Sequence, residues 1–184
     1  DTATPQQIAA ARAQADRLIQ RANAEDWFEN VTDSALPAVR HRPSGMRCLF
    51  VGNQYDQIAV FPTAQGGIPA GYDVGCVSRE ESLGVDLTLY ATRYRPLPTE
   101  QQIMGAAAQA VVSRYPGARP YGGDVALASA EGRPDPLSRA WTIAGARFTL
   151  AMVSHNREWG FKARANGDDP SMTHLYPSVA FAAA

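Results

Sequence analysis

Residues 84–117 read GVDLTLYATRYRPLPTEQQIMGAAAQAVVSRYPG, and the spacing of the apolar residues changes near the middle of this stretch. From residue 85 to residue 92, apolar and polar side chains alternate, which predicts a strand with one buried face. Thr99 and Gln102 then form a capping box, and small apolar residues recur at helical spacing as far as Val111. This switch predicts a strand followed by a helix that packs closely on a sheet, which favours an α+β fold.

A second capping box, formed by Thr4 and Gln7, predicts a helix at the beginning of the chain. Apolar residues follow it at helical spacing in one narrow stripe, and two aromatic residues beginning at Trp27 come directly after the stripe. We expect residues 1–30 to form an N-terminal helix with this aromatic anchor. Residues 31–184 are expected to form a single α+β domain, and the two parts make one compact unit.

Strand-like segments precede and follow the central stretch, and turn-rich loops separate them. They lie at 46–51, 57–61, 72–78, 84–94, 124–128, 139–155 and 158–165. The first two predict a hairpin, residues 33–45 read as a connection, and the tail at 172–184 is compatible with a short helix or a closing strand. We therefore expect a two-layer sandwich, in which a mostly antiparallel sheet of about 6–7 strands carries the long N-terminal helix and the second helix.

The order of the expected elements has a known parallel. Over residues 46–165, hairpins lead into a strand, a capped helix and further strands, and this order resembles the Mog1/PsbP-like arrangement. The resemblance is one of element order and has no signature motif behind it. It therefore implies a fold and carries no function.

Two cysteines, Cys48 and Cys76, lie 28 positions apart, and neither belongs to a C-x-x-C motif. In a simple meander of the first three strands, they would sit two strands apart, at about 10 Å, whereas a disulfide needs Cα atoms within about 7 Å. We predict the disulfide, with the glycine-rich loop at 62–71 letting the third strand return beside the first. The alternative is a pair of buried thiols that act as small apolar groups.

The start of the chain and its composition favour an exported bacterial protein. The chain begins at Asp1, inside a polar stretch that is typical of a mature end after removal of a signal peptide, and it contains one lysine, Lys162. An even number of cysteines fits a periplasmic or secreted protein. A lipid anchor ahead of Asp1 in a longer form stays an alternative. Whether Asp1 is a natural end is left open, because a shortened chain would begin in the same way.

Charge and motifs exclude several classes of function. A net charge of −1 gives no electrostatic basis for binding nucleic acid or an anionic membrane surface, and no apolar run is long enough to span a membrane. The chain contains no H-E-x-x-H, G-x-S-x-G, G-x-G-x-x-G or Walker motif. We therefore expect neither a cofactor nor a metal ion.

The loop that leads into the Cys48 strand is the first candidate site. Arg40, His41, Arg42 and Ser44 place cationic donors and a hydroxyl together, and such donors bind a carboxylate or a phosphate. The alternative is a structural loop, tied to the fold by arginine hydrogen bonds to backbone carbonyls, with Gly45 at a positive φ. A hydroxyl beside a histidine also keeps a small hydrolase or transferase with a dispersed site under consideration.

A second candidate is a Tyr/Arg surface made by Tyr90, Arg93 and Tyr94, a composition common at protein interfaces. Solvent-facing residues of an ordinary amphipathic strand would give the same pattern. The function favoured by these observations is a non-enzymatic binding or accessory protein of the cell envelope, whose partner is a protein or a small ligand. The alternatives are the enzyme near His41 and Ser44, and a homodimeric accessory subunit that uses the Tyr/Arg strand as its contact.

Overall fold

The computed structural model describes residues 3–62, 67–124, 128, 131–145 and 147–184. Its helices are α1 (Pro5–Arg21), α2 (Glu100–Arg114) and α3 (Pro170–Ala183). Its strands are β1 (Phe28–Asn30), β2 (Ala38–His41), β3 (Arg47–Leu49), β4 (Gln57–Val60), β5 (Asp73–Glu80), β6 (Val85–Arg93), β7 (Arg119–Pro120), β8 (Leu137–Ile143), β9 (Arg147–Asn156) and β10 (Trp159–Gly167).

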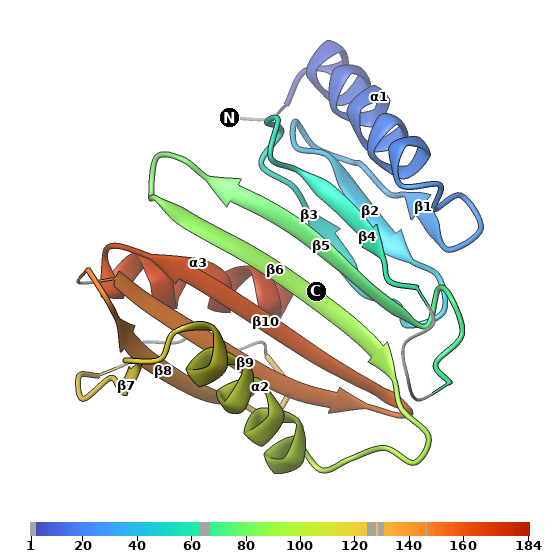
Figure 1. Cartoon of the computed structure of the whole chain (residues 1–184). Helices are drawn as coiled ribbons and strands as arrows, with labels where there is room; N and C mark the ends of the chain where they lie inside the picture. The colour runs from blue at the N-terminus through green and yellow to red at the C-terminus, as the bar shows by residue number, and fades with distance from the viewer. Residues whose placement is uncertain (1–2, 63–66, 125–127, 129–130, 146) are drawn as a thin grey trace.

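The strands form two antiparallel sheets. The large sheet has the order β4-β5-β6-β10-β9-β8-β7, and the small sheet has the order β1-β2-β3. Helix α2 packs on β8 and β9 on one face of the large sheet, whereas α3 and the small sheet lie behind the opposite face (Figure 1). Helix α1 packs on the small sheet and on β4. The predicted α+β class and the mostly antiparallel sheet are therefore confirmed, with a second sheet that the sequence did not indicate.

Both predicted capping boxes are present. The Thr4 hydroxyl accepts the amide of Gln7 at 3.2 Å, and the Gln7 side chain accepts the amide of Thr4 at 2.8 Å. Thr99 and Gln102 make the same reciprocal pair at the start of α2, at 3.1 and 2.9 Å. These bonds satisfy two amides that have no partner inside each helix. The predicted helices are confirmed, and the tail is a helix, α3.

The alternating strand is β6, as predicted. Four of its apolar side chains are buried against α3 and the small sheet, namely Val85, Leu87, Leu89 and Ala91. The polar positions between them are half-buried and point to the other face, on the side of α2. One strand thus separates the main core from the face that α2 covers in part.

The predicted hairpin of 46–51 with 57–61 is wrong. Strand β3 pairs with β2 in the small sheet, and β4 pairs with β5 in the large sheet. The reason lies in Asp56, whose buried carboxylate accepts the amides of Gly52 at 2.7 Å and of Asn53 at 3.1 Å. These bonds shape residues 52–56 into a crossing between sheets instead of a hairpin turn. The expected connection at 33–45 accordingly contains β2, the partner of β3.

The predicted disulfide between Cys48 and Cys76 is confirmed, with a Cα–Cα distance of 6.3 Å. The expected route is wrong, because the third strand does not return beside the first. Cys48 lies on β3 and Cys76 on β5, so the bond joins the small sheet to the large one. Opposed sheets bring the two sulfurs together where neighbouring strands of one meander would keep them apart.

The later strands follow the prediction with one correction. The expected segment at 139–155 divides at Ala144 and Gly145 into β8 and β9, and 158–165 becomes β10. Of the expected strand at 124–128, residues 125–127 lie outside the described residues, as do Asp1 and residues 63–66 of the glycine-rich loop at 62–71. Strand β10 pairs with β6 and β9 along nearly its whole length, and this pairing fixes which side chains share a face of the sheet.

Candidate functional site

The predicted ligand loop is the turn between β2 and β3, and His41 is its centre. The ring of His41 is fully buried. Its Nε2–H donates to the carbonyl of Gly71 at 2.8 Å, and its Nδ1 accepts the hydroxyl hydrogen of Ser44 at 2.8 Å. The carbonyl partner assigns this tautomer, because a carbonyl can only accept. His41 therefore links the β2–β3 turn to the segment that enters β5.

The surroundings of His41 favour the neutral imidazole. Burial lowers the pKa of His41 to about 4, and the hydrogen bond to Gly71 opposes this change only in part. The ring packs against Phe28 and Trp159, with centroids 5.1 and 5.4 Å away. A general base works best with a pKa near the working pH, and no carboxylate among the described residues bonds to this ring. His41 is thus a weak base in this setting.

Ser44 has a second bond that ties it to the turn. Its Oγ accepts the amide of Met46 at 3.1 Å, while its hydrogen goes to His41. Gly45 between them has φ +78°, the left-handed conformation expected for this position. The hydroxyl therefore stabilises the turn, although Ser44 also lies at the edge of a cavity.

The two arginines of the loop have partners. Arg40 pairs with Glu29 on the adjacent strand, with an Nε–Oε1 distance of 2.7 Å. Arg42 donates to the backbone carbonyl of Glu25 at 2.8 Å. The first contact joins β2 to β1, and the second fastens the turn to the segment between α1 and β1. The structure brings the four predicted loop residues together, but it engages their polar groups with the protein itself.

The predicted Tyr/Arg surface residues do not come together. Tyr90 lies on the face of β6 that α2 leaves open, whereas Arg93 lies at the other face, where it pairs with Glu158 and sits over the ring of Tyr72. Tyr94 is half-buried beside α2, and burial raises the pKa of its hydroxyl. These residues therefore belong to three separate environments.

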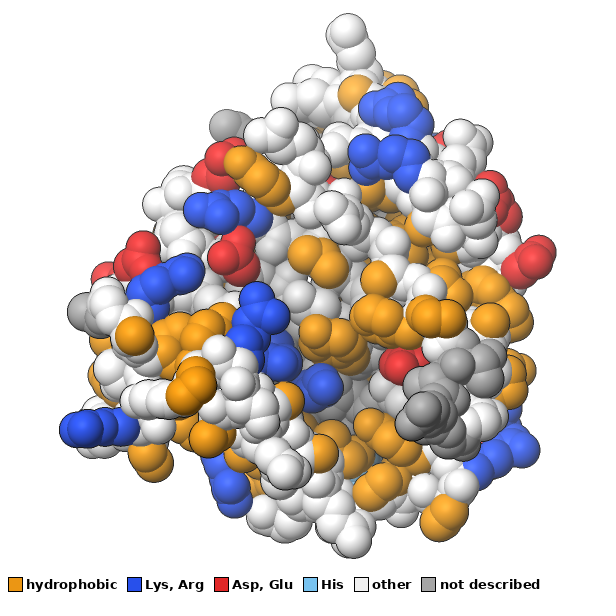
Figure 2. All heavy atoms as spheres, viewed as in Figure 1, with side chains coloured by type: hydrophobic (Ala, Val, Ile, Leu, Met, Phe, Trp, Pro, Cys, Tyr) orange, Lys and Arg blue, Asp and Glu red, His pale blue; other side chains and the backbone are white. Residues whose placement is uncertain are grey.

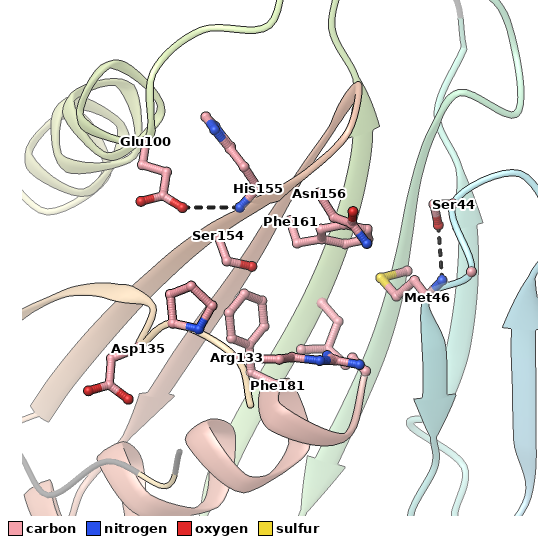
Figure 3. Close-up of a pocket in the computed structure, with 14 residues that line it drawn as sticks. Ser44, Met46, Glu100, Arg133, Asp135, Ser154, His155, Asn156, Phe161 and Phe181 are labelled. Carbon is pink, nitrogen blue, oxygen red and sulfur yellow. Dashed lines mark hydrogen bonds between the residues drawn. The ribbon is translucent and has the colours of Figure 1, made fainter. Parts of the chain in front are cut away.

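A pocket of about 470 Å³ lies between the large sheet, the β2–β3 turn and the end of α3. Its apolar walls come from four distant parts of the chain, namely Met46, Leu89, Phe161 and Phe181. Figure 3 shows Ser154, Arg133, Phe161 and Phe181 around one space, whereas the ring of His155 points away from it. Met46 and Leu89 are buried, and the two phenylalanine rings are partly exposed to the cavity.

Charged side chains also line the pocket, namely Glu100, Arg133 and Asp135. Arg133 forms no ion pair with any residue in the described ranges. Glu100 is engaged, since its Oε1 accepts the amide of His155 at 3.1 Å. Of the predicted site residues, only Ser44 lines this pocket. Sequence reasoning missed the others, and the only local signal was the alternation of β6 and β10, which puts Leu89 and Phe161 on the inward face.

The possible metal ligands, the helices and the comparisons with known proteins also bear on the site. Among the described residues there is no group of three or more His, Cys, Asp or Glu side chains that could hold a metal ion. None of the helices in the described part of the chain is long and apolar enough to cross a membrane. No family model, curated protein or solved structure matches the chain. The Mog1/PsbP-like resemblance therefore stays a prediction.

Proposed function

We propose that this chain is an exported, non-enzymatic binding domain of the bacterial cell envelope, and that its ligand lies in the pocket between α3 and the large sheet. The observation that carries the proposal is the cavity of about 470 Å³ with its apolar walls. Small-molecule sites in proteins have volumes of about 300–1,000 Å³, apolar walls and a few polar groups at defined places. This pocket has all three properties.

The lining indicates the class of ligand. Buried Met46 and Leu89, together with the rings of Phe161 and Phe181, favour an apolar body. Arg133, which lines the pocket, offers a guanidinium that is not engaged in an ion pair with the described residues. A guanidinium binds a carboxylate or a related anion in a planar, two-bonded geometry. The ligand is therefore a small amphipathic molecule with one anionic group.

The test uses 1-anilinonaphthalene-8-sulfonate, a fluorescent probe with apolar rings and one anionic group. The expected result is binding that Ser154→Trp weakens by at least about tenfold, because an indole fills the cavity, and that Arg133→Gln weakens by about three- to tenfold. Arg17→Gln, at an exposed position on α1, is the matched control and should bind like the wild type. Equal binding by all four proteins would place the probe elsewhere and refute the pocket as the site.

A small hydrolase or transferase is the second candidate function, and one observation favours it. The Ser44 hydroxyl lies 2.8 Å from His41 Nδ1 and borders the pocket. The low pKa of His41 and the bond from Met46 to Ser44 speak against an activated nucleophile. A fluorophosphonate probe should therefore leave the protein unlabelled. If the wild type is labelled and Ser44→Ala is not, the protein is a hydrolase or transferase, and the proposal of a non-enzymatic binding domain is wrong.

The proposal of export rests on the disulfide. Disulfides persist in oxidising compartments and are rare in the cytosol. If the full coding sequence is expressed in its host, the protein should be recovered outside the cytoplasm with Cys48 and Cys76 paired. Recovery in the cytoplasmic fraction with two free thiols would contradict export and leave the pocket proposal untouched.

A further inference from the structure

Among the described residues, no helix packs on the face of β6 and β10 that lies on the side of α2. Helix α2 packs on β8 and β9, and the same face of β6 and β10 lies open beside it (Figures 1 and 2). This face is opposite to the one that forms the pocket, because β6 and β10 send alternate side chains to the two sides. In Figure 2, hydrophobic side chains gather over the middle of this face with Lys and Arg side chains next to them.

Aromatic rings and a cation form a row across the open face. The ring of Phe61 lies over Gly75, where a Cβ would come within 3.4 Å of it, and stacks on Tyr90 with a centroid distance of 6.1 Å. The register then places Lys162 opposite Tyr90, and its Nζ lies 4.5 Å from the centre of that ring. The absence of a side chain at Gly75 gives Phe61 the room to lie on the sheet.

Arg164 follows Lys162 on the same face of β10, opposite Thr88. Neither cation forms an ion pair with a residue that the structure describes, whereas Arg79 and Arg147 of the same sheet pair with Asp86 and Asp168. The two cations thus differ from their neighbours in lacking a carboxylate.

The surroundings of Lys162 do not neutralise its charge. Burial lowers the pKa of this lysine, Arg164 lowers it further, and Asp73 opposes both. Asp73 bonds to the hydroxyl of Thr92 at 2.9 Å and forms no ion pair with the lysine. A half-buried ammonium next to a guanidinium is costly without an anion, and an incoming carboxylate would remove that cost.

We propose that Lys162 and Arg164, with the Phe61–Tyr90 rings beside them, form a docking surface for an extended acidic segment of a partner protein. Charge complementarity indicates an acidic partner, since neither Lys162 nor Arg164 forms an ion pair within the described part of the chain. The distance between the two cations indicates that the bound segment is extended. Side chains two residues apart on a strand are about 7 Å apart, so carboxylates at alternate positions of an extended segment match the two cations. The rings then accept an apolar or aromatic side chain of that segment.

The test measures binding of a dye-labelled peptide with the repeat Glu-Tyr-Glu-Tyr-Glu by fluorescence anisotropy. The control peptide carries Gln in place of Glu. The wild-type protein should bind the acidic peptide, and the double variant Lys162→Gln/Arg164→Gln should bind it at least about tenfold more weakly. Removing two charges elsewhere, in Arg17→Gln/Arg119→Gln, should leave the affinity within about twofold of the wild type at the same salt concentration.

Several outcomes would overturn the proposal. Equal binding of the acidic and neutral peptides would exclude carboxylate recognition, and equal losses in the two double variants would reduce the effect to net charge. No binding of the acidic peptide would also refute it. Tighter binding to anionic phospholipid vesicles, lost in Lys162→Gln/Arg164→Gln, would assign the face to a membrane. A dimer that this variant dissociates would assign it to a second copy of the chain.

The single lysine of the chain gives an independent readout. Acetylation by an amine-reactive ester modifies Lys162 and the α-amino group, and mass spectrometry separates the two sites. The acidic peptide should slow acetylation of Lys162 at least about threefold and leave the α-amino group unchanged. Equal protection of both amines, or of neither, would show that the peptide does not contact Lys162.

Discussion

Lowering the pH should destabilise the fold through His41, which is fully buried and bonded on both ring nitrogens. The pKa of His41 in the folded chain is about 4, against 6.5 for an unperturbed histidine. Between these values the unfolded chain binds a proton that the folded chain excludes, so stability is present above pH 6.5 and is lost as the pH falls towards 4. Linkage gives a loss of about 2 kcal/mol between pH 7.5 and pH 5, and about 3 kcal/mol by pH 4.

The assay is urea unfolding at pH 7.5 and pH 5, followed by tryptophan fluorescence. Other groups titrate in the same range. Burial also lowers the pKa of His174, which adds a loss of the same sign, so the comparison needs a variant. His41→Phe keeps an aromatic ring at the position but removes the titrating group. At pH 7.5 it should be about 2–4 kcal/mol less stable than the wild type, because Gly71 and Ser44 lose a partner.

The decisive quantity is the difference between the two pH dependences. On going to pH 5, the variant should lose about 2 kcal/mol less stability than the wild type. Parallel losses would refute the assignment to His41. If the variant does not fold, the histidine Cε1–H signals of the wild type provide the test, since the His41 signal should not titrate above pH 5. A titration midpoint near 6.5, the pKa of an unperturbed histidine, would contradict the buried, neutral imidazole.

The remaining predictions concern stability. Replacing both Cys48 and Cys76 by Ala should cost about 3.5 kcal/mol in urea unfolding, and the wild type should show a two-hydrogen mass deficit under non-reducing conditions; a full thiol mass would contradict the bond. Gly71→Ala should lower the free energy of unfolding by more than about 3 kcal/mol, because the new Cβ would overlap the indole ring of Trp27. Gly45→Ala has open space around the new Cβ and should lower it by only about 1–2 kcal/mol, and equal losses in the two variants would refute the packing argument. Asp56→Ala should lower the free energy of unfolding by about 2–4 kcal/mol, because the partly buried amides of Gly52 and Asn53 lose their acceptor, and a loss below about 1 kcal/mol would contradict that role.

Local signals in the sequence were sufficient for α1, for α2 and for the strand at 85–93, whereas they left the tail open between a helix and a strand. The capping boxes at Thr4 and Thr99 involve residues three positions apart, so they act before any tertiary contact forms. The strand shows its buried face by alternation alone. Strand pairing could not be predicted in this way. The hairpin expected from 46–61 does not form, because the Asp56 carboxylate accepts the amides of Gly52 and Asn53. That carboxylate is buried only once the two sheets have met, and no local pattern indicates it.

Of the residues that line the pocket, the sequence pointed only to Ser44, because the others come together only in the folded chain. Its turn could be recognised from the loop composition, but the pocket takes Phe181 from the tail and Arg133 from a loop that carries no motif. Such a site exists only after α3 has packed on the sheet. The sequence indicated polar groups around His41 correctly, yet it could not show that those groups bond to the protein itself.

The two proposed sites share the same two strands, and this sharing constrains both. On β6, Leu89 lines the pocket and its neighbour Tyr90 lies in the aromatic row on the other face. On β10, Phe161 lines the pocket and Lys162 lies beside Tyr90. Adjacent residues of a strand point to opposite faces, so a one-residue slip of β6 against β10 would destroy both sites together. Changes of single side chains should act on one face alone. Ser154→Trp should therefore weaken probe binding at least about tenfold without altering acetylation of Lys162. A change in both would mean that the variant has disturbed the sheet itself.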